Sequence, residues 1–380
     1  MRIAIVTEVW RPSINGVVTR LAATVRELGR LGHEVLVIAP KGGEPDFDGA
    51  RVRGVPTVSV PFIYGGKPWG MPVPRVVGYL REFRPDVVHV VNPVWLGIAG
   101  VVAAQLGRLP LVASYHTDVP KYASFYHLGW ASKGIWSLVR LLHNRAQVNL
   151  CTSESARKVL ASHGVRAPEL WGPGVDARLF DPGLRPGSRD MFTSDPDTVV
   201  ALYVGRLGPE KGLHRLEPLA ATPGVHLVVV GEGPEKGRLA ARLAGPSVTF
   251  TGPLTGDSLA AAYAAADVFV FPSTTETLGL VIFEAMAAGV PVVAAETPSS
   301  RELLGSCQAS RLFPPDCPDL VPKLVDDLLS GSDFDTRAKL LRERVVAFTW
   351  PEATKDLVRH YRAGVAARQS RSGSTAGGAS

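Results

Sequence analysis

The 380-residue sequence has little of several features that define common protein classes. Its three cysteines, Cys151, Cys307 and Cys317, form no Cys-x-x-Cys pair, which argues against a disulfide framework and predicts a reduced, cytoplasmic setting. It contains no run of 18 apolar residues, so a membrane-spanning helix is not predicted. The apolar run at residues 3–6 is followed by Glu8, which favours a buried strand over a signal peptide.

The sequence also lacks the motifs of two further functional classes, the Ser-His-Asp hydrolases and the nucleic-acid-binding proteins. The chain has no Gly-x-Ser-x-Gly sequence, so hydrolysis by a Ser-His-Asp triad is not supported. The net charge of +6 is accompanied by no helix–turn–helix or ribonucleoprotein motif, so nucleic-acid binding is not predicted.

What the sequence does contain is enough apolar material for a large core. Hydrophobic residues make up 46% of the chain and charged residues 20%, and 380 residues suffice for two α/β domains. The charge is uneven: residues 1–185 hold 22 Lys and Arg against 13 Asp and Glu, and the remainder holds 19 against 22. The basic half could attract an anionic ligand or an anionic lipid surface, or it could be an ordinary Arg-rich surface.

Short apolar segments alternate with amphipathic ones in both halves of the chain, which predicts parallel βαβ units. Strands are predicted at residues 2–6, 34–39, 87–91, 111–115, 148–152, 199–204, 226–230, 248–250, 268–271 and 290–294. Helices are predicted at residues 17–31, 213–220, 280–289 and 350–361, and Ser153 is a predicted helix cap. The Pro-, Gly- and Asp-rich segment 181–196 is predicted to be an interdomain linker.

The most informative segment is residues 274–286, in which Glu276 and Glu284 are separated by seven residues. Glu276 follows a predicted strand, so it lies where open α/β sheets bind ligands. The amides of residues 278–280 are placed at a helix N-terminus, which is a ready site for an anion. This layout suits a ligand with a phosphate and two sets of sugar hydroxyls, one set for each carboxylate.

Two cations follow the predicted strand at residues 199–204. Arg206 and Lys211 lie five residues apart in a Gly-rich turn, where both could pair with a diphosphate or could be ordinary surface charges. Gly16 could allow a phosphate to approach the backbone or could simply begin a helix. The turn at residues 231–234 lacks the glycine spacing of a dinucleotide fingerprint and is interpreted as a strand-to-helix turn.

These features together resemble the retaining glycosyltransferases of family 4, which have the GT-B fold. Besides the two glutamates, the resemblance rests on residues 8–17 (EVWRPSINGV), 115–118 (YHTD), 174–176 (GVD) and 205–212 (GRLGPEKG). It covers roughly residues 1–361. It implies an α/β chain of two facing Rossmann-like domains with a cleft between them. The resemblance divides the chain into an acceptor-side domain at 1–185, a nucleotide-sugar domain at 196–349 and a helix at 350–363 that crosses back. The remaining residues, 364–380, are predicted to be a disordered tail.

The resemblance also implies a hexosyl- or pentosyltransferase that needs no cofactor and no metal. Glu284 would hold the ribose hydroxyls and Glu276 the donor-sugar hydroxyls, while Arg206 and Lys211 would stabilise the leaving diphosphate. His116 would contact the donor sugar, with a structural role as the alternative. The implied catalytic set is His116, Arg206, Lys211 and Glu276. The implied donor-binding set is Gly16, Arg206, Lys211, Leu254, Glu276, Thr277, Leu278, Gly279, Leu280 and Glu284.

Two Asp-x-Asp pairs could suggest a metal site. The metal-binding form of this motif belongs to a different, single-domain glycosyltransferase fold. Asp46 and Asp48 lie in an early loop, and Asp195 and Asp197 lie in the predicted linker. Both pairs are therefore interpreted as solvated turns, and no metal site is predicted.

The acceptor side is less determined by the sequence. Glu8, Asp118 and Lys121 are the acceptor-side candidates. The surrounding segments resemble sulfoquinovosyl and mannosyl glycolipid transferases and also the glycosyltransferases of aminoglycoside antibiotics. We expect a UDP-sugar donor and a small soluble acceptor of the aminocyclitol type, with a GDP-mannose- or UDP-sugar-dependent glycolipid transferase as the alternative. Residues 297–302 lack the glycine pair often seen there in the family, which leaves the donor-sugar contacts open.

The segment at residues 133–145 bears on membrane contact. It is basic, amphipathic and carries Trp136, so it could lie on a membrane surface or pack on its own sheet. The first case would make the protein peripheral at the inner membrane face. The sequence does not indicate an oligomeric state.

Three rival functions share parts of this pattern. A sugar-nucleotide epimerase would alter its sugar with no acceptor present. A phosphorylase would need a pyridoxal site and a longer chain. A non-catalytic sensor of sugar nucleotides would not need the full set of cations and carboxylates described above.

Overall fold

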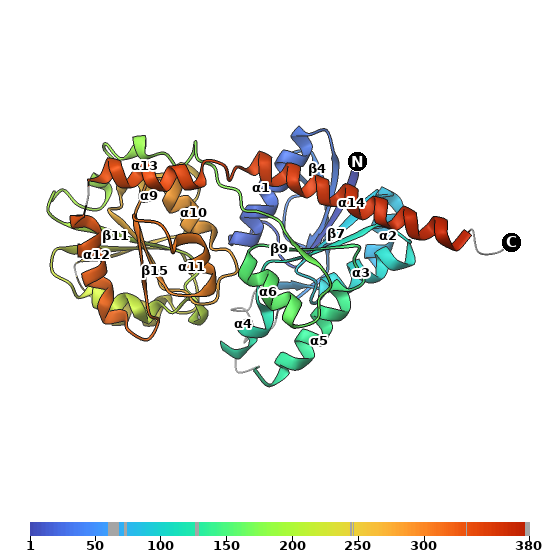
Figure 1. Cartoon of the computed structure of the whole chain (residues 1–380), viewed down its shortest axis with the longest axis horizontal. Helices are drawn as coiled ribbons and strands as arrows, with labels where there is room; N and C mark the ends of the chain where they lie inside the picture. Colours follow the sequence, from blue (N-terminus) through green and yellow to red (C-terminus); the bar gives the residue numbers. More distant parts are fainter. Residues whose placement is uncertain are drawn as a thin grey trace. The chain divides into compact units, whose positions relative to one another are not determined.

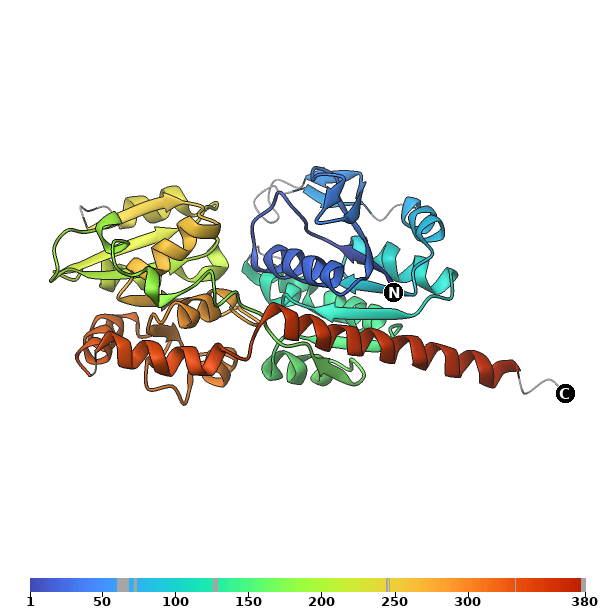
Figure 2. The same ribbon diagram turned by 90° about the horizontal axis from the view of Figure 1, so that it is seen from above.

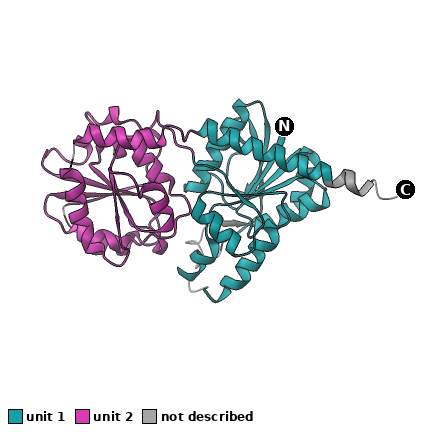
Figure 3. Ribbon diagram, in the orientation of Figure 1, with its two compact units in different colours: residues 1–173, 350–380 teal, residues 174–349 magenta. Residues whose placement is uncertain are grey.

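The computed structural model describes residues 1–59, 68–71, 74–125, 129–243, 245, 247–331 and 333–376. The chain forms two compact units, which we call unit 1 (residues 1–173 with 350–380) and unit 2 (residues 174–349) (Figure 3). Each unit has a largely parallel sheet covered by helices, as a Rossmann-like α/β domain requires.

Unit 1 is built on a sheet whose strand order, among the described residues, is β10-β9-β8-β7-β1-β2-β4-β3. Neighbouring strands are parallel except β3 and β4. The strands are β1 (Arg2–Thr7), β2 (Glu34–Pro40), β3 (Asp46–Phe47), β4 (Ala50–Val55), β7 (Val87–Val91), β8 (Leu111–Tyr115), β9 (Val148–Cys151) and β10 (Pro168–Leu170). Residues 3–6 of β1 are all fully buried, which explains the apolar run without alternation: both faces of this sheet are covered.

A separate antiparallel pair, β5 (Thr57–Ser59) and β6 (Pro68–Gly70), also belongs to unit 1. The helices of this unit are α1 (Gly16–Arg30), α2 (Arg75–Phe83), α3 (Leu96–Leu106), α4 (Val119–Phe125), α5 (Ser132–His143), α6 (Glu154–Ser162) and α14 (Trp350–Ala376). Helix α1 is capped by Asn15, whose side chain accepts from the Val18 amide at 3.0 Å. The predicted cap Ser153 is confirmed, because its hydroxyl accepts from the Ala156 amide at 3.2 Å and begins α6.

Unit 2 has the strand order β13-β12-β11-β14-β15-β16 among the described residues, and its neighbouring strands are parallel. The strands are β11 (Val199–Val204), β12 (Val225–Val230), β13 (Val248–Gly252), β14 (Val268–Phe271), β15 (Val292–Ala295) and β16 (Ser310–Phe313). The helices are α7 (Glu217–Ala220), α8 (Lys236–Arg242), α9 (Gly256–Ala265), α10 (Leu280–Ala287), α11 (Pro298–Leu304), α12 (Val321–Ser330) and α13 (Phe334–Val345). Figure 1 shows α9 to α13 around β11 and β15.

Most predicted strands agree with the structure to within two residues, but two predicted helices differ from it: the C-terminal helix is longer, and the other helix is broken. The helix expected at residues 213–220 is a 3₁₀ turn at Leu213–Leu216 followed by the short α7. Pro218 is tolerated only because it lies in the first turn of α7, where its missing N–H has no helical partner to bond.

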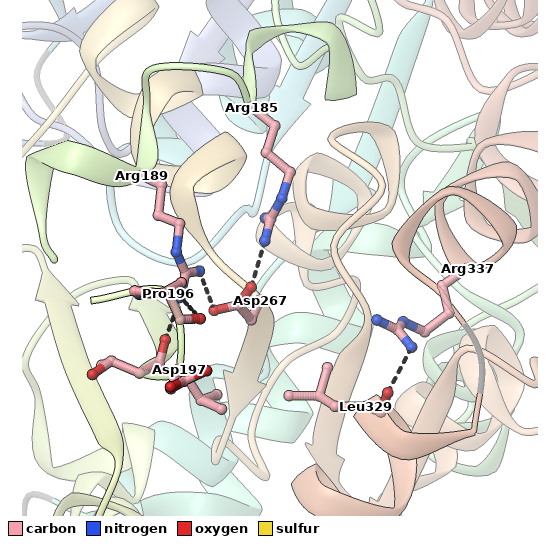
Figure 4. Close-up of a pocket in the computed structure, with 9 residues that line it drawn as sticks. Arg185, Arg189, Pro196, Asp197, Asp267, Leu329 and Arg337 are labelled. Atoms are coloured by element: carbon pink, nitrogen blue, oxygen red, sulfur yellow. Dashed lines mark hydrogen bonds and ion pairs between the residues drawn. The ribbon is translucent and has the colours of Figure 1, made fainter. Parts of the chain in front are cut away.

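The predicted linker was wrong. The chain passes between the units at residues 173–174 and 349–350, so the segment 181–196 lies inside unit 2. This segment is held by two arginines, Arg185 and Arg189, which both form ion pairs with Asp267 (Figure 4). Arg185 also donates to the carbonyl oxygen of Ala266 at 2.7 Å. Its Pro and Gly content describes an irregular segment, but the arginines fasten it to the sheet.

The predicted disordered tail was also wrong over most of its length. Helix α14 continues to Ala376 rather than ending near residue 363, and residues 377–380 lie outside the described part. Its first turns are anchored by Leu357, Val358 and Tyr361, which are buried in the core of unit 1, and Val365 packs against the same core. The helix lies along unit 1 and contacts α1 (Figure 2).

Candidate functional site

The sequence-predicted site residues of unit 2 gather at one edge of its sheet. Strands β11 and β14 are neighbours, and the connection from β11 leads to β12 on one side while the connection from β14 leads to β15 on the other. Such a switch point is where open α/β sheets bind ligands, at the carboxyl ends of the strands. The loop at residues 205–212 follows β11, and the loop at residues 272–279 follows β14.

The two loops meet in a direct ion pair. Lys211 Nζ donates to Glu276 Oε1, and the two side chains are 13% and 25% exposed. The Ser299 hydroxyl supports this loop by donating to the carbonyl oxygen of Glu276 at 3.1 Å. The cation assigned to a diphosphate and the carboxylate assigned to a sugar are therefore in contact with each other.

The second cation, Arg206, has a buried partner. Its Nη2 and Nε donate to Glu210 Oε1 at 2.9 and 3.2 Å, and the Glu210 side chain is fully buried. The carbonyl oxygen of Glu210 accepts from the Thr275 hydroxyl at 3.1 Å, which ties the first loop to the second. Glu210 sets the position of the Arg206 guanidinium, and sequence reasoning did not single it out although it lies within the quoted segment 205–212.

Glu284 lies one turn into α10 beside a buried tyrosine. Tyr263 donates from its hydroxyl to Glu284 Oε2 at 3.0 Å and also lies 3.1 Å from the carbonyl oxygen of Val281. Burial raises the pKa of Glu284 from 4.5 to about 7, and the Tyr263 hydroxyl opposes that rise. The carboxylate is thus held close to its protonation point at neutral pH, and a ligand that donates two hydrogen bonds would favour its charged form.

The start of α10 depends on glycine. Gly279 precedes the helix in the left-handed region with φ of 72°, a conformation that glycine adopts readily. Leu278 and Leu280 flank Gly279 in the sequence. Leu278 and Leu254 both pack against the hydrophobic core of unit 2. The first turn of α10 therefore offers backbone amides at the sheet edge where Glu276 and Lys211 also lie.

The turn at residues 231–234 packs backbone to backbone on the first loop. A Cβ on Gly231 would lie 1.9 Å from the carbonyl oxygen of Gly205, and a Cβ on Gly233 would lie 2.2 Å from that of Leu207. The Leu207 amide donates to the carbonyl oxygen of Glu232 at 3.0 Å. The two glycines are therefore needed for close packing that shapes the loop carrying Arg206.

In unit 1 the predicted residues are distributed over several loops. Gly16 is the first residue of α1, after the cap Asn15. His116 follows β8, and its backbone amide donates to Asn92 Oδ1 at 3.2 Å. Asp118 accepts from the amide of Lys121 at 3.1 Å at the start of α4. His116 and Asp118 lie in the connection that follows β8, whereas Gly16 begins α1 and Lys121 lies in α4.

Glu8 has a structural role that the sequence did not reveal. Its carboxylate accepts from the amides of Trp95, Leu96 and Gly97 at 2.8 to 2.9 Å, which caps the N-terminus of α3. Burial raises the pKa of Glu8, and these amide bonds oppose the rise. Its two oxygens are engaged by backbone, which weakens the case for Glu8 as a partner for an acceptor amine.

His116 belongs to a buried polar cluster that crosses the sheet of unit 1. Its Nε2 lies 2.8 Å from the Ser114 hydroxyl, which lies 2.8 Å from Nε2 of His89 in β7. Burial lowers the pKa of His116 well below its usual value, with Arg20 contributing in the same direction. A histidine within the apolar run at residues 87–91 was the available signal for this cluster, and sequence reasoning did not use it.

The Asp-x-Asp pairs form local contacts in the structure. Asp48 pairs with Arg26 at 3.0 Å, and Asp46 accepts from the Gly49 amide at 3.3 Å. Asp195 accepts from the Asp197 amide at 3.0 Å. Both pairs thus take part in turns, and the absence of a metal site there stays a prediction.

A cavity of about 330 Å³ lies at the opposite edge of the unit 2 sheet (Figure 4). It is lined by Val199 and Asp267, which stand at the amino ends of β11 and β14. Six strand residues separate that edge from residue 205, or about 20 Å. Two of its arginines, Arg185 and Arg189, anchor the segment 181–196, so the cavity lies apart from the loops that carry Lys211 and Glu276.

The helix predicted as a membrane candidate packs mostly on its own unit. In α5, Val139 and Leu142 are buried, and Trp136 stacks on His163 with ring centroids 3.7 Å apart. The exposed apolar side chains nearby are Leu141, at 52% exposed, and Trp130, at 82%, in the turn before α5. Among the described residues, no helix has the length and apolar character needed to cross a bilayer.

Two family descriptions match the chain. "Glycosyltransferase Family 4" matches residues 14–179, and "Glycosyl transferases group 1" matches residues 186–343. A GDP-mannose-dependent alpha-mannosyltransferase of Mycolicibacterium smegmatis is 40% identical over 370 residues, covering 96% of this chain and 97% of the relative. Sulfoquinovosyl transferase SQD2 of Arabidopsis thaliana is 35% identical over 355 residues, covering 90% of this chain and 69% of the relative.

Solved structures share the fold at lower identity. Sucrose-phosphate synthase from Thermosynechococcus elongatus has a TM-score of 0.79 at 22% identity, covering 95% of this chain and 98% of that one. Alr3699/HepE of Anabaena, in complex with UDP and glucose, has a TM-score of 0.77 at 21% identity, covering 94% of this chain and 98% of that one. At these identities the likeness establishes the architecture of two α/β domains and not the substrate.

Proposed function

The chain belongs to glycosyltransferase family 4 and has the GT-B fold, and on that premise we propose that it transfers mannose from GDP-mannose to a hydroxyl of a lipid acceptor with retention of configuration. It is a glycosyltransferase that uses a nucleotide sugar. The proposal concerns the nucleotide, the sugar, the acceptor and the stereochemistry.

The contact between Lys211 and Glu276 is the observation that carries the proposed donor site. A cation for phosphate and a carboxylate for sugar hydroxyls touch each other, so a ligand that satisfies both must have its phosphate next to its sugar. A nucleotide sugar meets this requirement at its glycosidic bond. Glu284, one turn into α10, would then hold the ribose hydroxyls at the other end of the diphosphate.

The proposed reaction breaks the bond between the anomeric carbon and the diphosphate oxygen. The acceptor oxygen bonds to the same face of that carbon, and its proton passes to the departing diphosphate. Arg206, oriented by Glu210, and Lys211 would stabilise the negative charge that develops on the leaving group. No carboxylate is assigned as a nucleophile, because Glu276 pairs with Lys211 and would hold sugar hydroxyls in the proposed complex.

GDP-mannose is preferred over the UDP-sugar expected from sequence because of the relatives. The M. smegmatis relative and one of Mycobacterium tuberculosis, 36% identical over 375 residues, are both named as GDP-mannose-dependent. Isothermal calorimetry with GDP-mannose, UDP-glucose and ADP-glucose tests the donor. We expect GDP-mannose to bind at least tenfold more tightly than the others, and tighter binding of UDP-glucose would contradict the donor assignment.

A lipid acceptor is preferred over a soluble aminocyclitol for three reasons. An alpha-monoglucosyldiacylglycerol synthase of Streptococcus pneumoniae is 26% identical over 360 residues, and the product in its name is a glycolipid. The exposed Trp130 precedes α5, and α5 carries the exposed Leu141 and the exposed cations Lys133 and Arg140, a composition suited to anionic lipid. Glu8, one of two carboxylates that an amine acceptor would need, is occupied by α3.

The acceptor is tested by sedimentation and by transfer of labelled mannose. We expect the protein to sediment with anionic liposomes at low salt, to be released by salt, and to do so less when Trp130 is replaced, Trp130→Ser. Leu184→Ser, an exposed apolar substitution in unit 2, is the matched control. Label in an aminocyclitol glycoside but not in a lipid extract would reverse the acceptor assignment.

A further inference from the structure

Four side chains from three distant parts of the sequence form a continuous hydrogen-bonded chain inside unit 1. The Tyr361 hydroxyl of α14 lies 2.8 Å from His89 Nδ1, and His89 Nε2 lies 2.8 Å from the Ser114 hydroxyl. That hydroxyl lies 2.8 Å from His116 Nε2, where the chain reaches the predicted site. Strand β7 and helix α14 are in contact, which brings His89 and Tyr361 together across 272 positions of sequence.

This hydrogen-bonded series, which we call the relay, is isolated from solvent, and its side chains are electrically neutral. His89 and Tyr361 are fully buried, Ser114 is 1% exposed and His116 is 8% exposed. Burial lowers the pKa of His89 to about 3 and raises that of Tyr361 well above its usual value. The buried guanidinium of Arg20 lies against the Trp171 ring at 3.8 Å, and its charge further disfavours protonation of both histidines. Both imidazoles therefore carry one hydrogen each.

The three hydrogen bonds of this relay allow only two arrangements of their hydrogens. The Ser114 hydroxyl has one hydrogen, so it donates to one Nε2 and accepts from the other. If His116 Nε2 carried a hydrogen, His89 would be protonated on Nδ1 and would donate to Tyr361. The Tyr361 hydroxyl hydrogen would then need another acceptor, and the described residues provide none for it.

The opposite arrangement pairs every group. Tyr361 donates to His89 Nδ1, His89 Nε2 donates to Ser114, and Ser114 donates to His116 Nε2. Leaving a buried hydroxyl hydrogen without an acceptor disfavours the first arrangement by roughly tenfold to a hundredfold. His116 then carries its hydrogen on Nδ1, which makes that nitrogen the donor of the ring.

We propose that Tyr361, His89 and Ser114 are positioning residues that hold His116 in the tautomer with hydrogen on Nδ1. The inference deepens the proposed function, because a donor at Nδ1 is what a hydroxyl oxygen of the transferred sugar would accept from. The C-terminal helix of the chain thereby determines the hydrogen-bonding character of a residue at the site. The nine histidines of the chain make the state of His116 measurable by selective labelling.

The first test reads the tautomer directly in the unaltered protein. Long-range proton–nitrogen NMR of the full chain labelled with nitrogen-15 histidine distinguishes protonated from bare ring nitrogens, and His89→Asn and His116→Gln assign the signals. We expect His116 with a protonated Nδ1 and a bare Nε2, and His89 with the reverse. A protonated Nε2 at His116 in the unaltered protein overturns the proposal whatever the activity.

The second test removes the hydrogen-bonding groups of the relay one at a time. Ser114→Ala should leave both tautomers of His116 populated and lower kcat roughly tenfold, with donor binding changed less, whereas Ser114→Thr keeps the hydroxyl and should restore most of kcat. Tyr361→Phe should lower kcat roughly threefold and alter the His89 signals. Tyr79→Phe, which removes the same atom from α2 of unit 1, should change neither; unaltered His116 signals in Ser114→Ala refute the relay.

Failure of this inference and failure of the proposed function can be told apart. If His116 has the expected tautomer but His116→Ala retains full mannosyl transfer, the relay stands and the role of His116 in transfer falls. If His116→Ala abolishes transfer but the tautomer is the opposite one, the function stands and the relay falls.

Discussion

Replacing Glu284 by glutamine should weaken donor binding and, at alkaline pH, should increase the stability of the protein without ligand. The glutamine keeps a carbonyl oxygen for the Tyr263 hydroxyl, which lies 3.0 Å from Glu284 Oε2, but it removes the charge. Two ribose hydroxyls would lose a charged acceptor, and each such bond contributes roughly 1.5–3 kcal/mol. We therefore expect Glu284→Gln to bind GDP-mannose at least tenfold more weakly.

The same substitution should stabilise the protein without ligand at alkaline pH. Burial raises the pKa of Glu284 from 4.5 in the unfolded chain to about 7 in the folded one, so the unfolded chain releases its proton first as pH rises. The free energy of unfolding therefore falls between these two pH values, by about 3 kcal/mol in total. Glutamine carries no such cost, so Glu284→Gln should resemble the unaltered protein at pH 4.5 and should be more stable by up to that amount at pH 8.

Thermal unfolding and calorimetry at both pH values measure the two effects together. Glu343→Gln, an exposed carboxylate of α13 in the same unit, is the control and should change neither stability nor donor affinity. Donor affinity unchanged in Glu284→Gln would refute the ribose assignment. Lower stability than the unaltered protein at pH 8 would refute the account of its burial.

Three further predictions concern the remaining site residues. Lys211→Ala should lower kcat at least a hundredfold while changing Tm by only a few degrees, and Lys236→Ala, from an exposed ion pair of the same unit, should leave kcat unaltered; equal losses in kcat would contradict the diphosphate assignment. EDTA should not change the rate, and inhibition reversed by magnesium or manganese would show that a metal takes part. Asp118→Asn should raise acceptor KM severalfold and leave donor affinity within twofold, and a larger donor effect would place Asp118 on the donor side.

The sequence predicts which two loops of unit 2 come together, because each loop follows a strand that the local pattern locates. The alternation of apolar strands and turns locates β11 and β14, and the residues directly after two neighbouring parallel strands must meet at one sheet edge. Glu276 and Lys211 are therefore brought together by topology that is visible in the pattern. The cap Ser153 is predictable for the same reason, since its bond to the Ala156 amide reaches only three residues along the chain.

Groups whose partners lie far away in sequence could not be predicted in this way. Glu8 has the appearance of a loop carboxylate, and only the packing of α3 gives it three backbone amides 87 to 89 positions away. Arg185 and Arg189 convert an apparent linker into part of unit 2 because Asp267 lies beside them. Irregular composition indicates the absence of regular structure, but the ion pairs that anchor such a segment depend on the fold.

The residues of this chain by themselves determined its two α/β domains, its glycosyltransferase family and the cations and carboxylates that follow β11 and β14. Only the tertiary structure decided how those groups are paired: Arg206 with Glu210, Glu284 with Tyr263, and His116 with a relay that ends on α14. The physical reason is range. Strand, turn and cap preferences act over a few residues, whereas the protonation of a buried side chain depends on whatever the fold places within 3 Å of it.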